Sequence, residues 1–576
     1  MVHFQRQRTK RHLHGWCWGI ATVLAVTAAL GSGVGASAAT EINPATGPAA
    51  GGTQVTVPDV TFTFAAVSPG DFHSAALDSN GNAYAWGYNG FGQLGNGTTT
   101  SSDVPVAVTM PPGVTFTSIY AAGVYSVALG SDGNAYAWGY NGTGQLGNGT
   151  WTYSSVPVAV TMPPGVTFTS INAYGWHSMA MGSDGNVYGW GYNSTGQLGN
   201  GTTTSSNVPV AVTKPPGVTF TSVSAGTAHS VALDSNGNAY TWGFNSNGQL
   251  GDGTETDSSV PVPVTMPAGV TFTSISAGTI NSAALGSDGN TYAWGYNGFG
   301  QLGNGTDTDS SVPVPVTMPA GVTFTSVKAG GNYSLALASD GNAYAWGYND
   351  HGGLGDGTTT ASSIPVAVTM PAGVTFTSVS TGSAHSVALG SDGNAYAWGF
   401  NSDGQLGDGT TIDSSIPLAV PAQLAVTSVT FDGTAGTGLA QNPDGTWSVT
   451  TPNHAAGAVD VVVEWTLNGI AQNPITHTGA FTFTGADESD GSGTDGDGGG
   501  IGGGGNSGGG NSGNDGTGGN DGTGGSGVDT LAFTGATSSI PLIAGSLSTA
   551  LMAAGILLVI INRKRNRGHT RETTNT

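Results

Sequence analysis

A fixed repeat period is the feature that most constrains this chain. Residues 83–98 read AYAWGYNGFGQLGNGT, and closely similar stretches recur every 52 residues. The tryptophan of the repeated stretch is found at Trp86, Trp138, Trp190, Trp242, Trp294, Trp346 and Trp398. A period of roughly 50 residues indicates an array of equal structural units, each of which buries its apolar surface against its neighbours.

Each unit predicts four short β-strands. In the fourth repeat the runs VTFTS, HSVAL, AYTWG and VPVPV alternate polar and apolar residues or are rich in β-branched residues. The second and third runs are separated by Asn-Gly or Asp-Gly, as at Asn80-Gly81, and these pairs favour a type I′ hairpin. Pro-Pro-Gly or Pro-Ala-Gly separates successive units and is a turn signal. The sequence therefore predicts an all-β fold whose main part, residues 60–423, is a seven-bladed β-propeller.

The repeated motifs resemble those of a known family. The pattern G-x-x-H-S-x-A-L, followed by D-G-N-x-Y-x-W-G and G-Q-L-G-x-G, resembles the regulator of chromosome condensation repeat. The resemblance covers residues 60–423 and implies a seven-bladed propeller whose tryptophans pack within or between blades. The best-known eukaryotic members exchange nucleotide on a small nuclear GTPase and bind chromatin. We expect neither activity here, because the sequence predicts an exported chain that is poor in arginine.

The N-terminus predicts a secretory signal peptide over residues 1–38. A basic start is followed by an apolar run and by small residues that end in Ala36-Ser37-Ala38, so we expect cleavage between Ala38 and Ala39. An uncleaved N-terminal membrane anchor is the alternative interpretation. The only cysteine, Cys17, lies within the signal, so the mature chain is expected to have neither a disulfide nor thiol chemistry.

The C-terminus predicts attachment to a cell wall. A pentapeptide at 531–535 precedes an apolar stretch at 540–561, which is long enough to span a bilayer as a helix, and a basic tail at 562–576. The pentapeptide is Leu531, Ala532, Phe533, Thr534 and Gly535. This order resembles the LPXTG-type sorting signal of Gram-positive surface proteins, with Ala532 in place of the usual proline. The resemblance implies that a sortase cuts after Thr534 and joins it to peptidoglycan. A plain membrane anchor is the alternative.

Two segments that flank the repeats predict a further domain. Residues 41–57 contain GP-x-x-GGT-x-V-x-V, and residues 424–485 contain VTFDGT and TTP-x-H-x-x-G-x-VDV. They resemble, respectively, the first strands and the remainder of the TIG/IPT type of immunoglobulin-like domain. We therefore expect one β-sandwich with the propeller inserted between its strands, since the ends of a closed ring lie close together. The alternative is that residues 41–57 belong to the first blade. Residues 487–530, rich in Gly, Asp, Asn and Ser, predict a flexible spacer.

Composition and motif spacing argue against several functions. Residues 39–534 carry 33 acidic residues and only two basic ones, Lys214 and Lys328, so we expect no nucleic-acid binding. One column of the repeats holds His73, His177, His229 and His385 but Tyr125, Asn281 and Tyr333 elsewhere, which favours a buried structural role. No catalytic triad, phosphate-binding loop or zinc-ligand spacing occurs, so we expect no enzyme activity, cofactor or metal. Calcium bound by acidic loops is the less favoured alternative.

Positions that differ between the repeats predict a binding face. They lie just before the second strand, after the third strand and before the fourth strand, and hairpin geometry places these loops on one side of the ring. Variable loops that carry aromatic residues on a rigid scaffold favour a binding surface. The residues that we expect to form it are Phe72, Phe91, Trp151, Tyr153, Trp176, Ile280 and Phe299. The alternative is neutral drift among duplicated blades, with some of the aromatic residues filling gaps.

These features predict a non-enzymatic, wall-anchored surface protein that binds an extracellular protein or glycan, as an adhesin or receptor does. Its partners would be a sortase, peptidoglycan and that ligand. Two alternatives stay open: an inhibitor or decoy of a secreted enzyme, and a purely structural wall protein.

Overall fold

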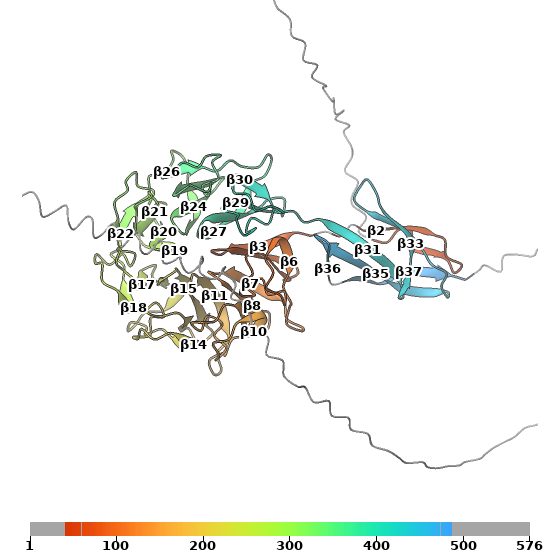
Figure 1. Ribbon diagram of the computed structural model, residues 1–576, viewed down its shortest axis with the longest axis horizontal. Helices are drawn as coiled ribbons and strands as arrows, with labels where there is room; N and C mark the ends of the chain where they lie inside the picture. The colour runs from red at the N-terminus through yellow and green to blue at the C-terminus, as the bar shows by residue number, and fades with distance from the viewer. Residues whose placement is uncertain (1–40, 59, 61, 473, 486–576) are drawn as a thin grey trace, which may run out of the picture. The chain divides into compact units, whose positions relative to one another are not determined.

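The computed structural model describes residues 41–58, 60, 62–472 and 474–485, which form strands, turns and loops without a helix (Figure 1). Within these residues no helix has the length and hydrophobicity that crossing a bilayer requires. The predicted signal peptide with its Ala38–Ala39 cleavage site lies outside the described residues, as do the spacer, the sorting pentapeptide, the apolar span and the basic tail.

Seven four-stranded antiparallel sheets, here called blades one to seven, follow one another along residues 64–419. Blades one and two are β3 (Phe64–Pro69), β4 (His73–Asp78), β5 (Ala83–Gly87), β6 (Ser102–Ala107), β7 (Phe116–Ala121), β8 (Tyr125–Gly130), β9 (Ala135–Gly139) and β10 (Ser154–Ala159). Blades three and four are β11 (Phe168–Tyr174), β12 (His177–Gly182), β13 (Val187–Gly191), β14 (Ser206–Ala211), β15 (Phe220–Ala225), β16 (His229–Asp234), β17 (Ala239–Gly243) and β18 (Ser258–Pro263). Blades five and six are β19 (Phe272–Ala277), β20 (Asn281–Gly286), β21 (Thr291–Gly295), β22 (Ser310–Pro315), β23 (Phe324–Ala329), β24 (Tyr333–Ala338), β25 (Ala343–Gly347) and β26 (Ser362–Ala367). Blade seven is β27 (Phe376–Thr381), β28 (His385–Gly390), β29 (Ala395–Gly399) and β30 (Ser414–Ala419).

The blades form a closed ring. The first strand of each blade lies toward the centre of the ring and the fourth lies at its periphery (Figure 1). Each blade packs on the next, and β27 and β28 of blade seven pack on β3 of blade one. This architecture confirms the predicted all-β fold of repeated four-stranded sheets arranged as a propeller.

The repeated tryptophans join neighbouring blades. All seven are fully buried. The indole Nε1 of Trp138 donates to the carbonyl oxygen of Gln93 in the preceding blade at 2.9 Å, and Trp86 closes the ring through the carbonyl oxygen of Gln405, also at 2.9 Å. A Cβ on Gly95, whose φ is 69°, would lie 2.6 Å from Nε1 of Trp138. This contact explains why the repeat needs a glycine there.

A two-sheet unit contains strands from the segments that precede and follow the ring in the sequence. Its larger sheet consists of β1 (Thr46–Pro48), β37 (Ile475–Thr484), β35 (Gly457–Leu467), β31 (Leu424–Phe431), β32 (Thr434–Ala435) and β36 (Ile470–Ala471). Its smaller sheet consists of β2 (Gln54–Val57), β34 (Trp447–Thr450) and β33 (Thr437–Gln441).

The two flanking segments share one apolar core. Strand β1 pairs in parallel with β37, and β2 pairs antiparallel with β34. Val55 and Val57 from before the ring are buried together with Phe431, Phe481 and Phe483 from after it. The assignment of this two-sheet unit to the immunoglobulin-like domains stays a prediction.

Candidate binding face

The loop between the third and fourth strands of each blade is fixed by a buried asparagine. In blade one, Oδ1 of Asn89 accepts from the backbone N–H of Leu94 at 2.9 Å, and Nδ2 donates to the carbonyl oxygens of Thr98 and Thr100 at 3.1 and 3.0 Å. The equivalent residues are Asn141, Asn193, Asn245, Asn297, Asn349 and Asn401, and all are buried. The seven loops therefore share one rigid frame, on which only a few side chains differ.

One differing position has a structural role in five blades. There a short oxygen-bearing side chain accepts from the backbone N–H of the buried asparagine. The five acceptors are Ser101, Ser205, Asp257, Asp309 and Asp413, at 2.7–3.2 Å. Blade six has Ala361 at this position and blade two has Tyr153. In blade two an aromatic ring has thus replaced the capping group.

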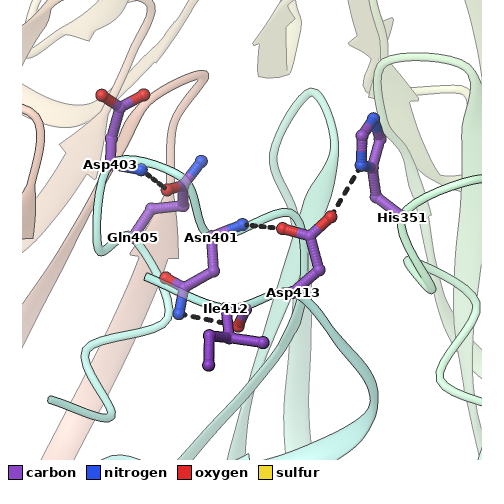
Figure 2. A network of polar contacts seen from close by, with 6 residues as sticks. All are labelled: His351, Asn401, Asp403, Gln405, Ile412 and Asp413. Carbon is purple, nitrogen blue, oxygen red and sulfur yellow. Dashed lines mark hydrogen bonds and ion pairs between the residues drawn. The ribbon is translucent and has the colours of Figure 1, made fainter. Parts of the chain in front are cut away.

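Blade seven shows the capped loop in detail (Figure 2). One carboxylate oxygen of Asp413 accepts from the backbone N–H of Asn401 at 2.8 Å, and the other lies 2.8 Å from Nδ1 of His351 in blade six. The side chains of His351 and Asp413 are 38 % and 39 % exposed. Because water screens such a pair, it contributes about 1 kcal/mol at most to stability. We interpret it as a contact between blades.

Six aromatic residues of blades one to three form a continuous series of ring contacts, which we call the aromatic cluster. Its members are Phe72, Tyr88, Phe91, Tyr140, Tyr153 and Trp176. Ring centroids are 5.5 Å apart for Phe91 and Tyr153, 4.8 Å for Tyr140 and Tyr153, and 5.9 Å for Tyr140 and Trp176. Such edge-to-face and tilted contacts hold the rings in a fixed arrangement.

The cluster has an exposed part on blade two. Tyr153 is 47 % exposed, and Trp151, at the tip of the same loop, is 51 % exposed. The structure thus brings together four of the residues expected from sequence, Phe72, Phe91, Tyr153 and Trp176, with Trp151 two residues from Tyr153.

Two other expected residues lie apart from the cluster. Phe299, 37 % exposed, contacts Tyr296 and Tyr348 with centroid distances of 6.1 and 5.1 Å and belongs to a separate group on blades five and six. Ile280 is only 7 % exposed, so it offers little surface to a ligand.

Sequence reasoning missed two members of the cluster. Tyr88 and Tyr140 directly follow the Trp-Gly pair and connect the other four rings. Every repeat has Tyr or Phe at this position, so the position does not stand out among those that differ between repeats. The signal that could have found them is the combination of an aromatic residue in every repeat with its place at the end of a strand on the variable side.

Carboxylates lie beside the cluster. Burial raises the pKa of Asp71, the neighbour of Phe72, to about 6. Burial also raises the pKa of Asp403 in blade seven, and the pKa of Tyr88 is raised by burial and by the nearby charge of Asp403. Among the described residues, no three His, Cys, Asp or Glu side chains are placed to hold a metal ion.

The sequence matches a described family over most of the ring. The RCC1-like domain matches residues 101–438, and the regulator of chromosome condensation (RCC1) repeat matches residues 64–93. The ultraviolet-B receptor UVR8 of Arabidopsis thaliana is 31 % identical over 371 residues, which cover 64 % of this chain and 83 % of the receptor. The E3 ubiquitin-protein ligase HERC2 of Homo sapiens is 31 % identical over 356 residues, which are 61 % of this chain but only 7 % of the ligase.

Solved structures share the fold. Human WBSCR16 superposes with a TM-score of 0.54 at 21 % identity, covering 65 % of this chain and 99 % of that one. Prp20p from Saccharomyces cerevisiae superposes with a TM-score of 0.53 at 23 % identity, covering 68 % and 93 %. The family match over more than half of the sequence and the closed ring of seven four-stranded blades lead to one conclusion: the chain belongs to the RCC1-like domain family.

Proposed function

We propose that this protein is a non-enzymatic surface protein of a Gram-positive cell whose propeller binds an extracellular protein or glycan through the aromatic cluster. In this proposal a signal peptide exports the chain and a sortase joins Thr534 to peptidoglycan. The support for export and anchoring is the order of segments in the sequence: signal, folded region, Gly-rich spacer, LAFTG, apolar span and basic tail.

The observation that carries the binding proposal is the exchange at Tyr153. Five blades use this position to cap their own loop, whereas blade two places a half-exposed ring there, in contact with Phe91 and Tyr140. Trp151 adds a second large exposed ring, while the seven tryptophans of the repeat are buried. Exposed Trp and Tyr on a rigid frame are typical of the residues that contribute most to binding energy.

The proposal also assigns the two-sheet unit to the TIG/IPT type of immunoglobulin-like domain. Support comes from the GP-x-x-GGT motif, whose segment 41–57 pairs with strands of residues 424–485.

The test is a binding screen with the full-length chain against arrays of glycans and secreted proteins. The matched variant carries Trp151→Thr and Tyr153→Ser, the residues that blades one and three have at these positions. A ligand that binds the original chain and is lost from the variant supports the proposal. A ligand that binds both equally places the site elsewhere, and the absence of any ligand favours a structural role.

A further inference from the structure

Charge is unevenly distributed over the seven loops that follow the third strand. The loops of blades one to three, residues 88–101, 140–153 and 192–205, contain no acidic residue. The corresponding loops of blades four to seven contain Asp252, Glu255, Asp257, Asp307, Asp309, Asp350, Asp356, Asp403, Asp408 and Asp413, which we call the acidic arc. Six of these are exposed: Glu255, Asp257, Asp307, Asp309, Asp350 and Asp413.

Among the described residues of the propeller, the loops of this face carry no lysine or arginine, and His351 of the blade-six loop already pairs with Asp413 at 2.8 Å. The two lysines of the propeller are Lys214 and Lys328, and neither belongs to the seven loops. Lys214 lies in the Pro-Pro-Gly connection to blade four, on the side of the ring that carries the hairpin turns, and Lys328 lies in the innermost strand of blade six. Lysine or arginine side chains that approach the acidic arc would therefore have to come from a partner.

The aromatic cluster borders the acidic arc. The blade-seven loop that carries Asp403 contacts blade one, where Nε1 of Trp86 donates to the carbonyl oxygen of Gln405 at 2.9 Å. Consistent with this contact, the pKa of Tyr88 is raised by burial and by the charge of Asp403. A lysine or arginine side chain is attracted to the face of an aromatic ring and pairs with a carboxylate, and its apolar stem packs on the same rings. A neutral sugar would use the rings but gain nothing from the charge.

We propose that the occupant of the aromatic cluster is a basic polypeptide segment, whose Lys and Arg side chains stack on Tyr153 and Trp151 and reach the acidic arc. This inference rests on the proposed binding function and specifies the chemical class of its ligand. The aromatic cluster supplies the contact area, and the acidic arc attracts the segment and excludes acidic partners.

The test measures fluorescence anisotropy of labelled probes with the full-length chain. The probes are a short peptide rich in lysine, arginine and leucine, the same peptide with glutamine at every basic position, and an N-acetylglucosamine oligomer. Two binding variants, Trp151→Thr with Tyr153→Ser and Glu255→Thr with Asp307→Thr, carry residues that other blades have at these positions, so the loop frame is kept. The control Ile364→Val alters an exposed residue of a peripheral strand and gives it the side chain found in blades one to five.

We expect the basic peptide to bind more tightly than the other two probes, and we expect its affinity to fall as the salt concentration rises. The aromatic variant should lose about tenfold in affinity and the acidic variant a few-fold, whereas the control should not change. Binding of the sugar oligomer alone, with loss in the aromatic variant, overturns the basic occupant but keeps the proposed binding function. Equal binding of the basic peptide to the original chain and to the aromatic variant overturns this inference. If the ligands found on the arrays also bind the original chain and the aromatic variant equally, the proposed binding site is overturned as well.

Discussion

At the scale of single residues, the histidine column shows how one position links the blades. Nε2 of His229 lies 2.9 Å from the hydroxyl oxygen of Ser282 in the next blade, and the equivalent histidines make the same contact. Ser282 donates its proton to the carbonyl oxygen of Gln249, so the histidine must donate through Nε2–H. Tyr125 and Tyr333 reach the equivalent serines through their hydroxyl groups. The two tyrosines thus retain the hydrogen bond between blades, whereas Asn281 of blade five does not, because both polar atoms of its buried side chain lack a partner.

We predict that these histidines make the fold sensitive to acid. Burial lowers the pKa of His73, His177, His229 and His385 from 6.5 to about 3. The unfolded chain therefore binds more protons below pH 6.5, and the unfolding free energy should fall as pH decreases toward 3, by up to about 1.4 kcal/mol per pH unit and histidine. Urea unfolding at about pH 7 and about pH 5 measures this slope. His229→Tyr, which copies Tyr125 and Tyr333, should reduce it, and an unchanged slope would contradict this assignment.

At the scale of the structural element, the loop of blade two has an exposed aromatic ring, Tyr153, at the position where five other blades have a hydrogen-bonding cap. Tyr153→Ser should restore the cap on Asn141, because Ser101 and Ser205 make that hydrogen bond at 3.1 and 3.2 Å. One hydrogen bond contributes about 1 kcal/mol, so the variant should be as stable as the original chain or slightly more stable. It should also bind any ligand of the cluster more weakly. Thermal unfolding and the array screen test both parts, and a marked loss of stability would show that the ring is mainly a packing residue.

The same element shows which features sequence could predict. The strands and hairpins were predictable because Asn-Gly and Asp-Gly turns and alternating polarity act over a few residues. Three features were not predictable from sequence: the capping role of Asp413, the ring contacts of Tyr140 and the burial of Ile280. Each depends on how close a neighbouring loop or blade lies in space, and the local sequence pattern does not determine that distance. Four of the seven expected binding residues gather in one cluster, since their positions lie on the same side of successive blades.

At the scale of the whole molecule, the ring is an insertion between paired strands. Val55 is fully buried and belongs to β2, and its pairing partner is Val449 of β34, so contact between them spans the entire propeller in sequence. Val55→Ala should destabilise the two-sheet unit by about 2–3 kcal/mol, because it removes methyl groups from the core. Hydrogen exchange of residues 424–485 should increase while exchange in the blades stays unchanged. Unaltered protection of that segment would show that residues 41–57 are dispensable to the unit.

The proposed wall anchoring also concerns the whole molecule, and it would depend on a single peptide bond. If a sortase cuts between Thr534 and Gly535, the carbonyl carbon of Thr534 becomes bonded to peptidoglycan, and the apolar span and basic tail are left behind. Thr534→Ala should therefore shift the protein from the fraction released by muramidase digestion of the wall to the membrane fraction, with its C-terminal tail still attached. Thr537→Ala, which makes the same change three residues further on and outside the pentapeptide, should leave wall attachment intact. If both variants stay in the wall fraction, LAFTG is not the attachment signal. If the original chain itself keeps its tail in the membrane, the plain membrane anchor explains the C-terminus, and the propeller is held at the surface by the span at 540–561 instead.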